Sequence, residues 1–282
     1  MDKNNATTSL LAIDDGGYEV KIKSDKIQTS FPSVKGLLTT EPNLMTVTGE
    51  HDFIVELNDG SKYVAGELAV HDCPLRMEMN SFGKNHLFWD LSCLIAVYKY
   101  GGVNNKIAVS LPIKSYTKEE VENRKKRLEG SKTLTINGKT KTFFIEEVKV
   151  APETAISFFV NKDKGKTHYI DIGSRTVNSA SVVYENGKYR FIDSESDTFY
   201  NYGITALADK FNPRSLADYI GGRLIKTFDN KNKIYVLGGG ALNYDLVHYL
   251  KEYFPKLIVM ENPTTSNVRG MYELMKGAYG SD

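Results

Sequence analysis

The hydrophobic positions of the chain follow two patterns, short runs of strand character and longer segments with helical spacing. Residues 10–22 contain a hydrophobic run, a turn with two glycines and an arm that alternates hydrophobic residues with lysines, which predicts two strands joined by a tight turn. Residues 53–64 and 134–145 show a similar pattern around Asp-Gly and Asn-Gly pairs, which favour hairpins. The first half of the chain is therefore expected to contain antiparallel strands.

Helical spacing is clearest at residues 86–100, which end at two glycines, a helix-end signal. Pro152 predicts a further helix that begins at Ala151, because proline is favoured in the first helical turn. The remaining predicted helices are at 115–130, 215–228, 243–253 and 266–278, and the remaining predicted strands are at 106–112, 168–173, 178–184, 233–237 and 257–260. Strands that alternate with helices indicate α/β layers.

A hydrophobic strand that ends in an acidic glycine turn occurs twice. Asp14 ends the first such strand, and Asp171 ends the second, 157 positions further along. This weak internal repeat predicts two similar α/β halves, residues 1–150 and 151–282, that face one nucleotide cleft. The halves are expected to be joined by packed helices, since no low-complexity linker separates them.

Composition narrows the class of protein only moderately. The 282 residues are 41% hydrophobic and 25% charged, which suits a globular protein with a real core, and a net charge of +1 does not favour direct nucleic-acid binding. Cys73 and Cys93 lack metal-ligand spacing and suit a reducing compartment. The hydrophobic run at 10–13 is too short for a signal sequence, and no segment approaches the ~20 apolar residues of a membrane span. We therefore expect a cytoplasmic protein without a membrane partner.

The two acidic glycine turns carry groups that a nucleoside triphosphate requires. Phosphates need backbone N–H groups that can be approached closely, Mg²⁺ needs carboxylates, and hydrolysis needs a group that positions water. The turn at 14–18 offers a carboxylate and two glycines, and the turn at 171–176 offers a carboxylate, a glycine and two hydroxyls. Each turn alone also fits an ordinary Asp-Gly hairpin.

A third glycine element makes the nucleotide interpretation more specific. Gly238, Gly239 and Gly240 stand between a hydrophobic strand and a helix, where three glycines cost chain entropy unless something approaches the backbone closely. The alternative is a tight strand-to-helix turn. The Walker A pattern and a Gly-x-Gly-x-x-Gly after the first strand are both missing from the sequence, so the common phosphate loops do not apply.

In this order the motifs resemble those of the actin-like ATPase superfamily, which includes actin and the sugar kinases. The matching segments are 13–21 for the first phosphate motif, 151–155 for the first connecting motif, 170–176 for the second phosphate motif and 237–241 for the adenosine motif. The segment 261–272 is similar to the second connecting motif of the plasmid-segregating ParM and StbA branch. The resemblance implies an actin-like fold of two α/β, RNase H-like halves.

The resemblance also implies a role for individual residues. Asp14 and Asp171 would hold Mg²⁺ through water, and Glu153 would orient or activate the attacking water. The nucleotide would be lined by Gly16, Gly17, Tyr18, Lys21, Gly173, Ser174, Arg175 and Thr176 at the phosphates and by Gly238, Gly239, Gly240 and Ala241 at the adenosine. Lys21 has an alternative as an exposed strand lysine, and Glu153 as an acid that stabilises the dipole of a helix first turn. Arg175 replaces a usual glycine and would either face the phosphates or point to solvent.

One interval departs from the family. Gly238 follows Asp171 by only 67 positions, an interval where most relatives hold the peripheral subdomain called IIB. The chain therefore resembles the AlfA type of bacterial actin, with subdomain IB at about 31–80, no subdomain IIB, and a final helix at 266–278 that packs back on the first half. Without that subdomain, the resemblance leaves ATP and GTP both open.

The function implied is a filament-forming protein that binds ATP or ADP, with GTP as an alternative, and Mg²⁺. It would hydrolyse the triphosphate and move plasmid DNA through a DNA-binding adaptor on a centromere-like site, without binding nucleic acid itself. The alternative is a sugar or acid kinase of the same superfamily, although no acidic base for a substrate hydroxyl stands out. The basic run 124–127 is flanked by glutamates, which favours a solvated or filament-contact face. Tyrosines suited to protomer contacts are Tyr98, Tyr200, Tyr202 and Tyr244.

Overall fold

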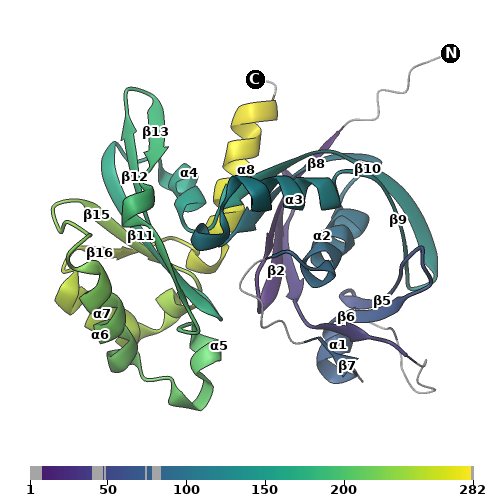
Figure 1. The fold of residues 1–282 in the computed structure, drawn as a ribbon, viewed down its shortest axis with the longest axis horizontal. Coiled ribbons are helices and arrows are strands. Elements are labelled where there is room, and N and C mark those ends of the chain that lie inside the picture. Colours follow the sequence, from purple (N-terminus) through teal and green to yellow (C-terminus); the bar gives the residue numbers. More distant parts are fainter. Residues whose placement is uncertain (1–7, 40–46, 48, 74, 78–83, 281–282) are drawn as a thin grey trace. The chain divides into compact units, whose positions relative to one another are not determined.

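The chain divides into two compact units, each with its own sheet (Figure 1). The computed structural model describes residues 8–280 apart from 40–46, 48, 74 and 78–83. The first unit is Met1–Ser110 with Lys118–Val150, and the second is Leu111–Thr117 with Ala151–Asp282. The polar segment 1–7 and parts of the expected subdomain 31–80 lie outside the described residues.

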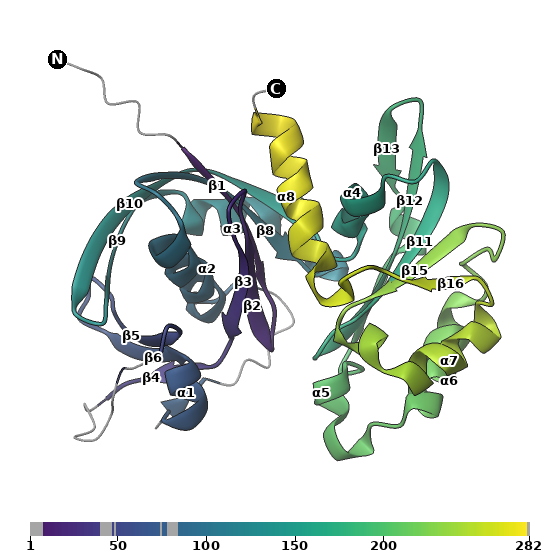
Figure 2. The same ribbon diagram turned by 180° about the vertical axis from the view of Figure 1, so that it is seen from behind.

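The first unit is built on one mixed sheet. Its strand order in the described part is β3-β2-β1-β8-β10-β9-β5-β6-β4-β7. The strands are β1 (Ser9–Asp15), β2 (Glu19–Lys23), β3 (Gln28–Pro32), β4 (Lys35–Leu37), β5 (Asp52–Glu56), β6 (Lys62–Gly66), β7 (Leu75–Arg76), β8 (Asn104–Leu111), β9 (Gly130–Ile136) and β10 (Lys139–Pro152). The helices are α1 (Glu67–His71), α2 (Leu87–Tyr100) and α3 (Lys118–Leu128). The sheet curves around α2, as the views from both sides show (Figure 2).

The position of α2 follows from its sequence. Most of its side chains are buried, in agreement with a helix that is hydrophobic nearly all round. His86 caps its start, because the ring Nδ1 accepts a hydrogen bond of 3.0 Å from the Phe88 amide, and the helix ends at Gly101. Tyr98 is buried and donates a hydrogen bond of 2.7 Å to the Lys139 carbonyl. Its predicted surface role in protomer contacts is therefore wrong.

The second unit has a smaller sheet with the order β13-β12-β11-β15-β16, and β14 pairs with β12. Its strands are β11 (Gly165–Ile172), β12 (Thr176–Glu185), β13 (Lys188–Phe191), β14 (Asp197–Tyr200), β15 (Lys233–Leu237) and β16 (Leu257–Val259). The α-helices are α4 (Phe158–Asn161), α5 (Ile204–Leu207), α6 (Pro213–Leu224), α7 (Tyr244–Tyr253) and α8 (Ser266–Tyr279). The 3-10 helices are η1 (Ile113–Ser115), η2 (Ala155–Ser157), η3 (Asp193–Glu195), η4 (Ala208–Lys210), η5 (Gly239–Leu242) and η6 (Pro263–Thr265).

The core of the second unit lies between its sheet and two helices. Side chains of β11 and β15 pack with α6 and α7 in one buried hydrophobic cluster. The figures show α6 and α7 on one face of the sheet and α4 and α8 on the other. The interval between Asp171 and Gly238 is filled by β12, β13, β14 and short helices, with α6 as the longest of them.

The two units repeat one arrangement of strands. In the first, β1 pairs antiparallel with β2 and parallel with β8. In the second, β11 pairs antiparallel with β12 and parallel with β15. Asp14 and Asp171 occupy the ends of β1 and β11, so the repeat predicted from the two acidic glycine turns is present in the fold.

One predicted element is wrong. The helix expected to begin at Ala151 is absent from this position, because β10 continues to Pro152. Pro152 ends the strand instead of opening a helix, which is consistent with its missing N–H. Thr154 then turns the chain with a positive φ of 66°, and η2 begins only at Ala155.

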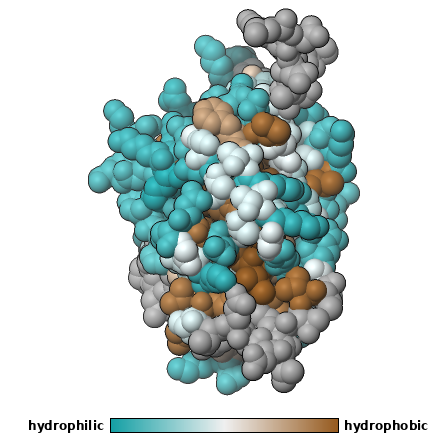
Figure 3. All heavy atoms as spheres, turned by 90° about the vertical axis from the view of Figure 1, so that its right-hand side faces the viewer, coloured by the Kyte–Doolittle hydropathy of each residue, from teal (hydrophilic) through white to brown (hydrophobic). Residues whose placement is uncertain are grey.

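None of the helices among the described residues is long and apolar enough to cross a membrane. On the face seen in Figure 3, hydrophilic side chains predominate and hydrophobic ones form small separate groups. Scattered groups of this kind are ordinary on a folded protein.

Candidate functional site

The first candidate loop joins β1 to β2. Asp14 is buried at the end of β1, and the strand register places it opposite Lys21, whose Nζ lies 3.8 Å from the Asp14 carboxylate. The Lys21 side chain is only 18% exposed, so the alternative of a freely exposed strand lysine is wrong. A Cβ added at Gly16 would lie 2.9 Å from the Glu19 carbonyl, which means that a larger residue would displace the loop. Tyr18 at its tip is exposed.

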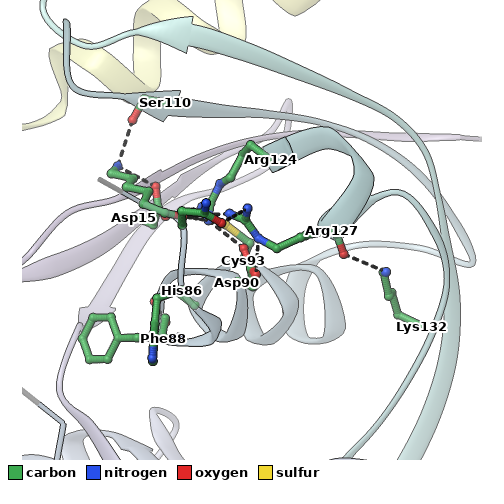
Figure 4. A network of polar contacts seen from close by, with 12 residues as sticks. Asp15, His86, Phe88, Asp90, Cys93, Ser110, Arg124, Arg127 and Lys132 are labelled. Carbon is green, nitrogen blue, oxygen red and sulfur yellow. Dashed lines mark hydrogen bonds and ion pairs between the residues drawn. The ribbon is translucent and has the colours of Figure 1, made fainter. Parts of the chain in front are cut away.

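Asp15 points away from this loop into the core of the first unit, as alternation along a strand requires. Its carboxylate is fully buried and accepts a hydrogen bond of 2.7 Å from Lys84 Nζ and another from the Arg124 guanidinium. Arg124 also donates to Asp90 at 2.7 Å, and Arg127 donates to the other Asp90 oxygen at 2.8 Å. Figure 4 shows these side chains meeting beside Cys93.

The network holds buried charge next to the first loop. Burial disfavours the charged form of Arg124, yet its neighbours, Asp15 first and Asp90 among the others, together outweigh this effect and raise the guanidinium pKa, so Arg124 stays protonated. Burial raises the pKa of the Cys93 thiol, which is therefore a neutral thiol. The interpretation of 124–127 as a solvated face is wrong for Arg124, which is fully buried.

A sequence signal for this network existed but was weak. Asp15 follows Asp14 at the end of a hydrophobic strand, and a buried carboxylate needs a partner. Arg124 and Leu128, four positions apart, are the buried residues of the otherwise polar α3. Nothing local indicates that Asp15 and Arg124 meet, since they are 109 positions apart in the chain.

The second candidate loop joins β11 to β12. Gly173 N–H donates to the Thr176 carbonyl at 3.0 Å and closes the turn. The carbonyls of Gly173 and Ser174 accept hydrogen bonds of 2.9–3.0 Å from the first backbone N–H groups of α5, at 204–206. Arg175 is partly buried, and burial lowers its pKa, so it does not simply point to solvent.

The Asp171 carboxylate is buried beside this loop. Its Oδ2 accepts hydrogen bonds from Asn267 Nδ2 at 2.7 Å and from Thr154 Oγ1 at 3.4 Å. Gly238 approaches the other oxygen: it has φ +81°, and a Cβ there would lie 2.4 Å from Asp171 Oδ1. The loop after β15 is therefore in contact with Asp171.

The three glycines after β15, Gly238 to Gly240, differ in their surroundings: two are closely packed and one faces open space. A Cβ at Gly240 would lie 2.3 Å from the Ile172 side chain, so Gly238 and Gly240 are required by packing within the protein. A Cβ at Gly239 would meet nothing within 4 Å. The structural alternative accounts for two of the three glycines, and the backbone at Gly239 remains approachable. Ala241 is buried behind it.

Glu153 lies in the turn between β10 and η2. Its N–H donates to the Leu111 carbonyl at 2.9 Å, and Asn178 Nδ2 lies 3.5 Å from its Oε2. The neighbouring η2 and α4 have no acidic residue in their first turns, so the alternative that Glu153 stabilises a helix dipole is wrong. Within the second unit, Thr154 thus connects the Glu153 turn to Asp171 by a hydrogen bond, and Gly238 lies directly against Asp171.

Comparison with known proteins identifies the family. The family model described as actin-like proteins, N-terminal domain, matches residues 12–155, which is half of the chain. The chain belongs to the actin-like proteins. The match includes the loop after β1, β8 and the Glu153 turn.

Solved structures show how far the actin-like fold extends along this chain. Apo ParM of pSK41 is 20% identical with a TM-score of 0.72, and the alignment covers 97% of this chain and 98% of that one. AlfA from the B. subtilis plasmid pLS32, solved as a filament, is 19% identical with a TM-score of 0.75, covering 97% and 100%. An archaeal actin homologue in complex with ADP is 16% identical with a TM-score of 0.76, covering 96% and 100%. No curated protein matches the chain by sequence.

These findings confirm the predicted actin-like α/β fold and its likeness to the ParM and AlfA actins. Sequence reasoning also found the strand ends and glycine turns of this actin-like protein. It missed Asn267, although this asparagine lies within the segment that resembles the second connecting motif. A polar residue near the start of a helix gave no sign that it bonds to Asp171.

Proposed function

We propose that this actin-like protein binds ATP or GTP with Mg²⁺, assembles into filaments and hydrolyses the nucleotide as the filament ages. The observation that carries the proposal is the repeated strand–Asp–glycine turn in both units, together with the Glu153 turn of the second unit, where the next residue, Thr154, donates a hydrogen bond to Asp171. Two structural neighbours, AlfA and a ParM from Clostridium botulinum, form filaments, and an archaeal neighbour binds ADP.

The residues present suit a magnesium nucleotide. Asp14 and Asp171 are single carboxylates at strand ends, and Mg²⁺ commonly binds one or two carboxylates and keeps its waters. Lys21 beside Asp14 adds positive charge for the phosphates. Gly16, Gly17, Tyr18, Gly173, Ser174, Arg175 and Thr176 would line the phosphates, and Gly238, Gly239, Gly240 and Ala241 would line the adenosine side.

Glu153 is proposed to orient the attacking water. Its carboxylate has Asn178 at 3.5 Å, and Asn178 is itself held by Thr198 Oγ1 at 2.7 Å. A carboxylate fixed in this way can accept a proton from the attacking water and direct the lone pair of the water oxygen at the phosphate. This speeds hydrolysis without a covalent intermediate on the protein.

The biological role proposed is plasmid DNA segregation. The filament would act through a DNA-binding adaptor on a centromere-like site, since the net charge of +1 does not favour direct DNA binding. Nucleotide state would control the filament because a bound triphosphate favours the assembling conformation. We also propose that the chain consists of two actin-like halves, residues 1–150 and 151–282, and that it lacks subdomain IIB.

Assembly and phosphate release test the proposal together. We expect light scattering to rise when Mg-ATP or Mg-GTP is added to micromolar protein, with filaments in electron micrographs and phosphate release that follows assembly. Glu153→Ala should still assemble but release phosphate about 10²–10⁴ times more slowly, so its filaments should outlast those of the wild type. The proposal would be contradicted if the protein failed both to assemble and to hydrolyse with each of the two nucleotides. Phosphate transfer to sugars or acids without polymer would instead support the small-molecule kinase.

A further inference from the structure

Asn267, in the first turn of α8, connects three parts of the second unit through one amide group. Its Oδ1 accepts hydrogen bonds of 2.9 Å from the Thr154 backbone N–H and of 2.9 Å from the Ser157 hydroxyl. Its Nδ2 donates a hydrogen bond of 2.7 Å to Asp171 Oδ2. The amide therefore bonds to the residue after Glu153 and to the carboxylate of the second loop at once.

The chemistry of these partners fixes the orientation of the amide. A backbone N–H can only donate, so the atom that faces Thr154 must be the oxygen. An ionised carboxylate can only accept, so the atom that faces Asp171 must be the nitrogen. Aspartate, alanine and leucine cannot satisfy both partners.

Thr154 occupies a backbone conformation that needs such support. Its φ of 66° and ψ of −58° form a γ-turn, closed by a hydrogen bond of 2.6 Å from the Ala155 N–H to the Glu153 carbonyl. A non-glycine residue in this region is strained and persists only where the surroundings hold it. The backbone N–H of Thr154 donates a hydrogen bond to Asn267, and the Thr154 hydroxyl donates one to Asp171.

The packing of α8 makes this support rigid. A Cβ added at Gly270 would lie 2.2 Å from the Ile156 carbonyl, so α8 lies directly against the backbone of η2. The buried Ser157 hydroxyl adds a bond from η2 to the same Asn267 oxygen. The start of α8 and the segment after Glu153 are therefore joined by both close packing and hydrogen bonds.

We propose that Asn267 is a positioning residue for nucleotide hydrolysis, which sets the Glu153 turn against the Asp171 carboxylate. This inference rests on the proposed function, because it assigns Glu153 to water and Asp171 to Mg²⁺. The asparagine itself touches neither water nor phosphate in the proposal. Its effect is geometric: without the amide, the strained turn relaxes and Glu153 moves relative to Asp171.

The test compares hydrolysis with nucleotide binding in matched variants. Asn267→Ala should lower kcat by about tenfold to 10²-fold, the loss expected from a small misplacement of a catalytic group, while the dissociation constant for a fluorescent ATP analogue changes less than about threefold. Ser157→Ala removes one of the two bonds to the Asn267 oxygen but keeps the bonds of Asn267 to Thr154 and Asp171, so its loss of kcat should be smaller than that of Asn267→Ala. Asn105→Ala is the structural control, because Asn105 is a buried asparagine of the first unit that also makes three hydrogen bonds. Its hydrolysis per folded molecule should equal that of the wild type.

The separation of kcat from nucleotide affinity is the readout that a merely structural role would not give, because a general loss of structure would weaken nucleotide binding as well. An unchanged kcat in Asn267→Ala, or equal kcat losses in Asn267→Ala and Asn105→Ala, would overturn the inference. Lack of hydrolysis by the wild type would instead overturn the proposed function.

Discussion

Lys35 places an ammonium group in the interior of the first unit. Its side chain is 1% exposed, and Nζ donates hydrogen bonds of 2.9 Å to the Ser33 carbonyl and 2.7 Å to the Ser92 hydroxyl. The Phe88 ring centroid lies 3.7 Å from the same nitrogen. Burial lowers the Lys35 pKa to about 7, although the charge of Asp15 opposes this effect. The lysine is thus a neutral or charged group depending on pH near neutrality.

This residue should make stability depend on pH. Between the folded pKa of about 7 and the unfolded value of 10.5, the unfolded chain binds a proton at Lys35 that the folded chain lacks. The free energy of unfolding should therefore rise with pH across this window by up to one proton's slope, and the contribution should level off below about pH 7. Urea unfolding of the wild type and of Lys35→Met between pH 7 and 10 isolates the effect, since other groups are common to both. Equal slopes in the two proteins would show that Lys35 stays protonated when folded.

Local sequence pattern predicted the regular elements of this protein but not its buried polar contacts. The hairpin at Asn137-Gly138 and the helix at 86–100 depend on turn chemistry and side-chain spacing, which neighbouring residues specify. The end of β10 at Pro152 was not recognised, because the pairing of β10 with the adjacent β9 stops at Ile145 and its other neighbour in the sheet, β8, lies earlier in the chain. Arg124 and Asn267 were missed for the same reason: their partners, Asp15 and Asp171, are 109 and 96 residues away.

Helix α3 shows how one buried ion pair attaches a polar element to the core. Its surface is largely charged, and Arg124 and Leu128 are its buried side chains. Arg124 reaches both Asp15 at the end of β1 and Asp90 on α2, so it connects three elements. In this network the negative charges of Asp15 and Asp90 offset most of the positive charge of three cations, which are Lys84, Arg124 and Arg127.

Removing this arginine should destabilise the first unit strongly. Arg124→Met leaves Asp15 and Asp90 short of a partner, and breaking a buried pair in this way costs about 3–5 kcal/mol. Urea unfolding measures the loss, and Lys126→Met on the exposed side of α3 is the matched control, expected within about 0.5 kcal/mol of the wild type. Adding Asp15→Asn to Arg124→Met should recover part of the loss, because the uncompensated charge is removed. A loss no larger than that of the control would mean that the pair contributes little.

At the scale of the whole molecule, the repeated arrangement gives each unit one aspartate at the same topological position. Asp14 precedes the β1–β2 turn, and Asp171 precedes the β11–β12 turn. Each is buried, and each has polar partners from its own unit, Lys21 for the first and Asn267 for the second. If both aspartates serve one magnesium nucleotide, as proposed, neither unit should bind it alone with full affinity.

Thermal unfolding of the full chain distinguishes one shared nucleotide from two separate ones. Mg-nucleotide should stabilise the wild type by about 2.7 kcal/mol when free ligand is about 100 times its Kd, and a metal chelator should remove the effect. Asp14→Asn and Asp171→Asn should each abolish the stabilisation, and the double variant should lose no more than either single one, because a ligand lost once cannot be lost again. The exposed Asp209→Asn should keep the full shift. Half of the shift retained in each single variant would instead show that the two units bind ligand independently, which would contradict a single nucleotide held by both aspartates.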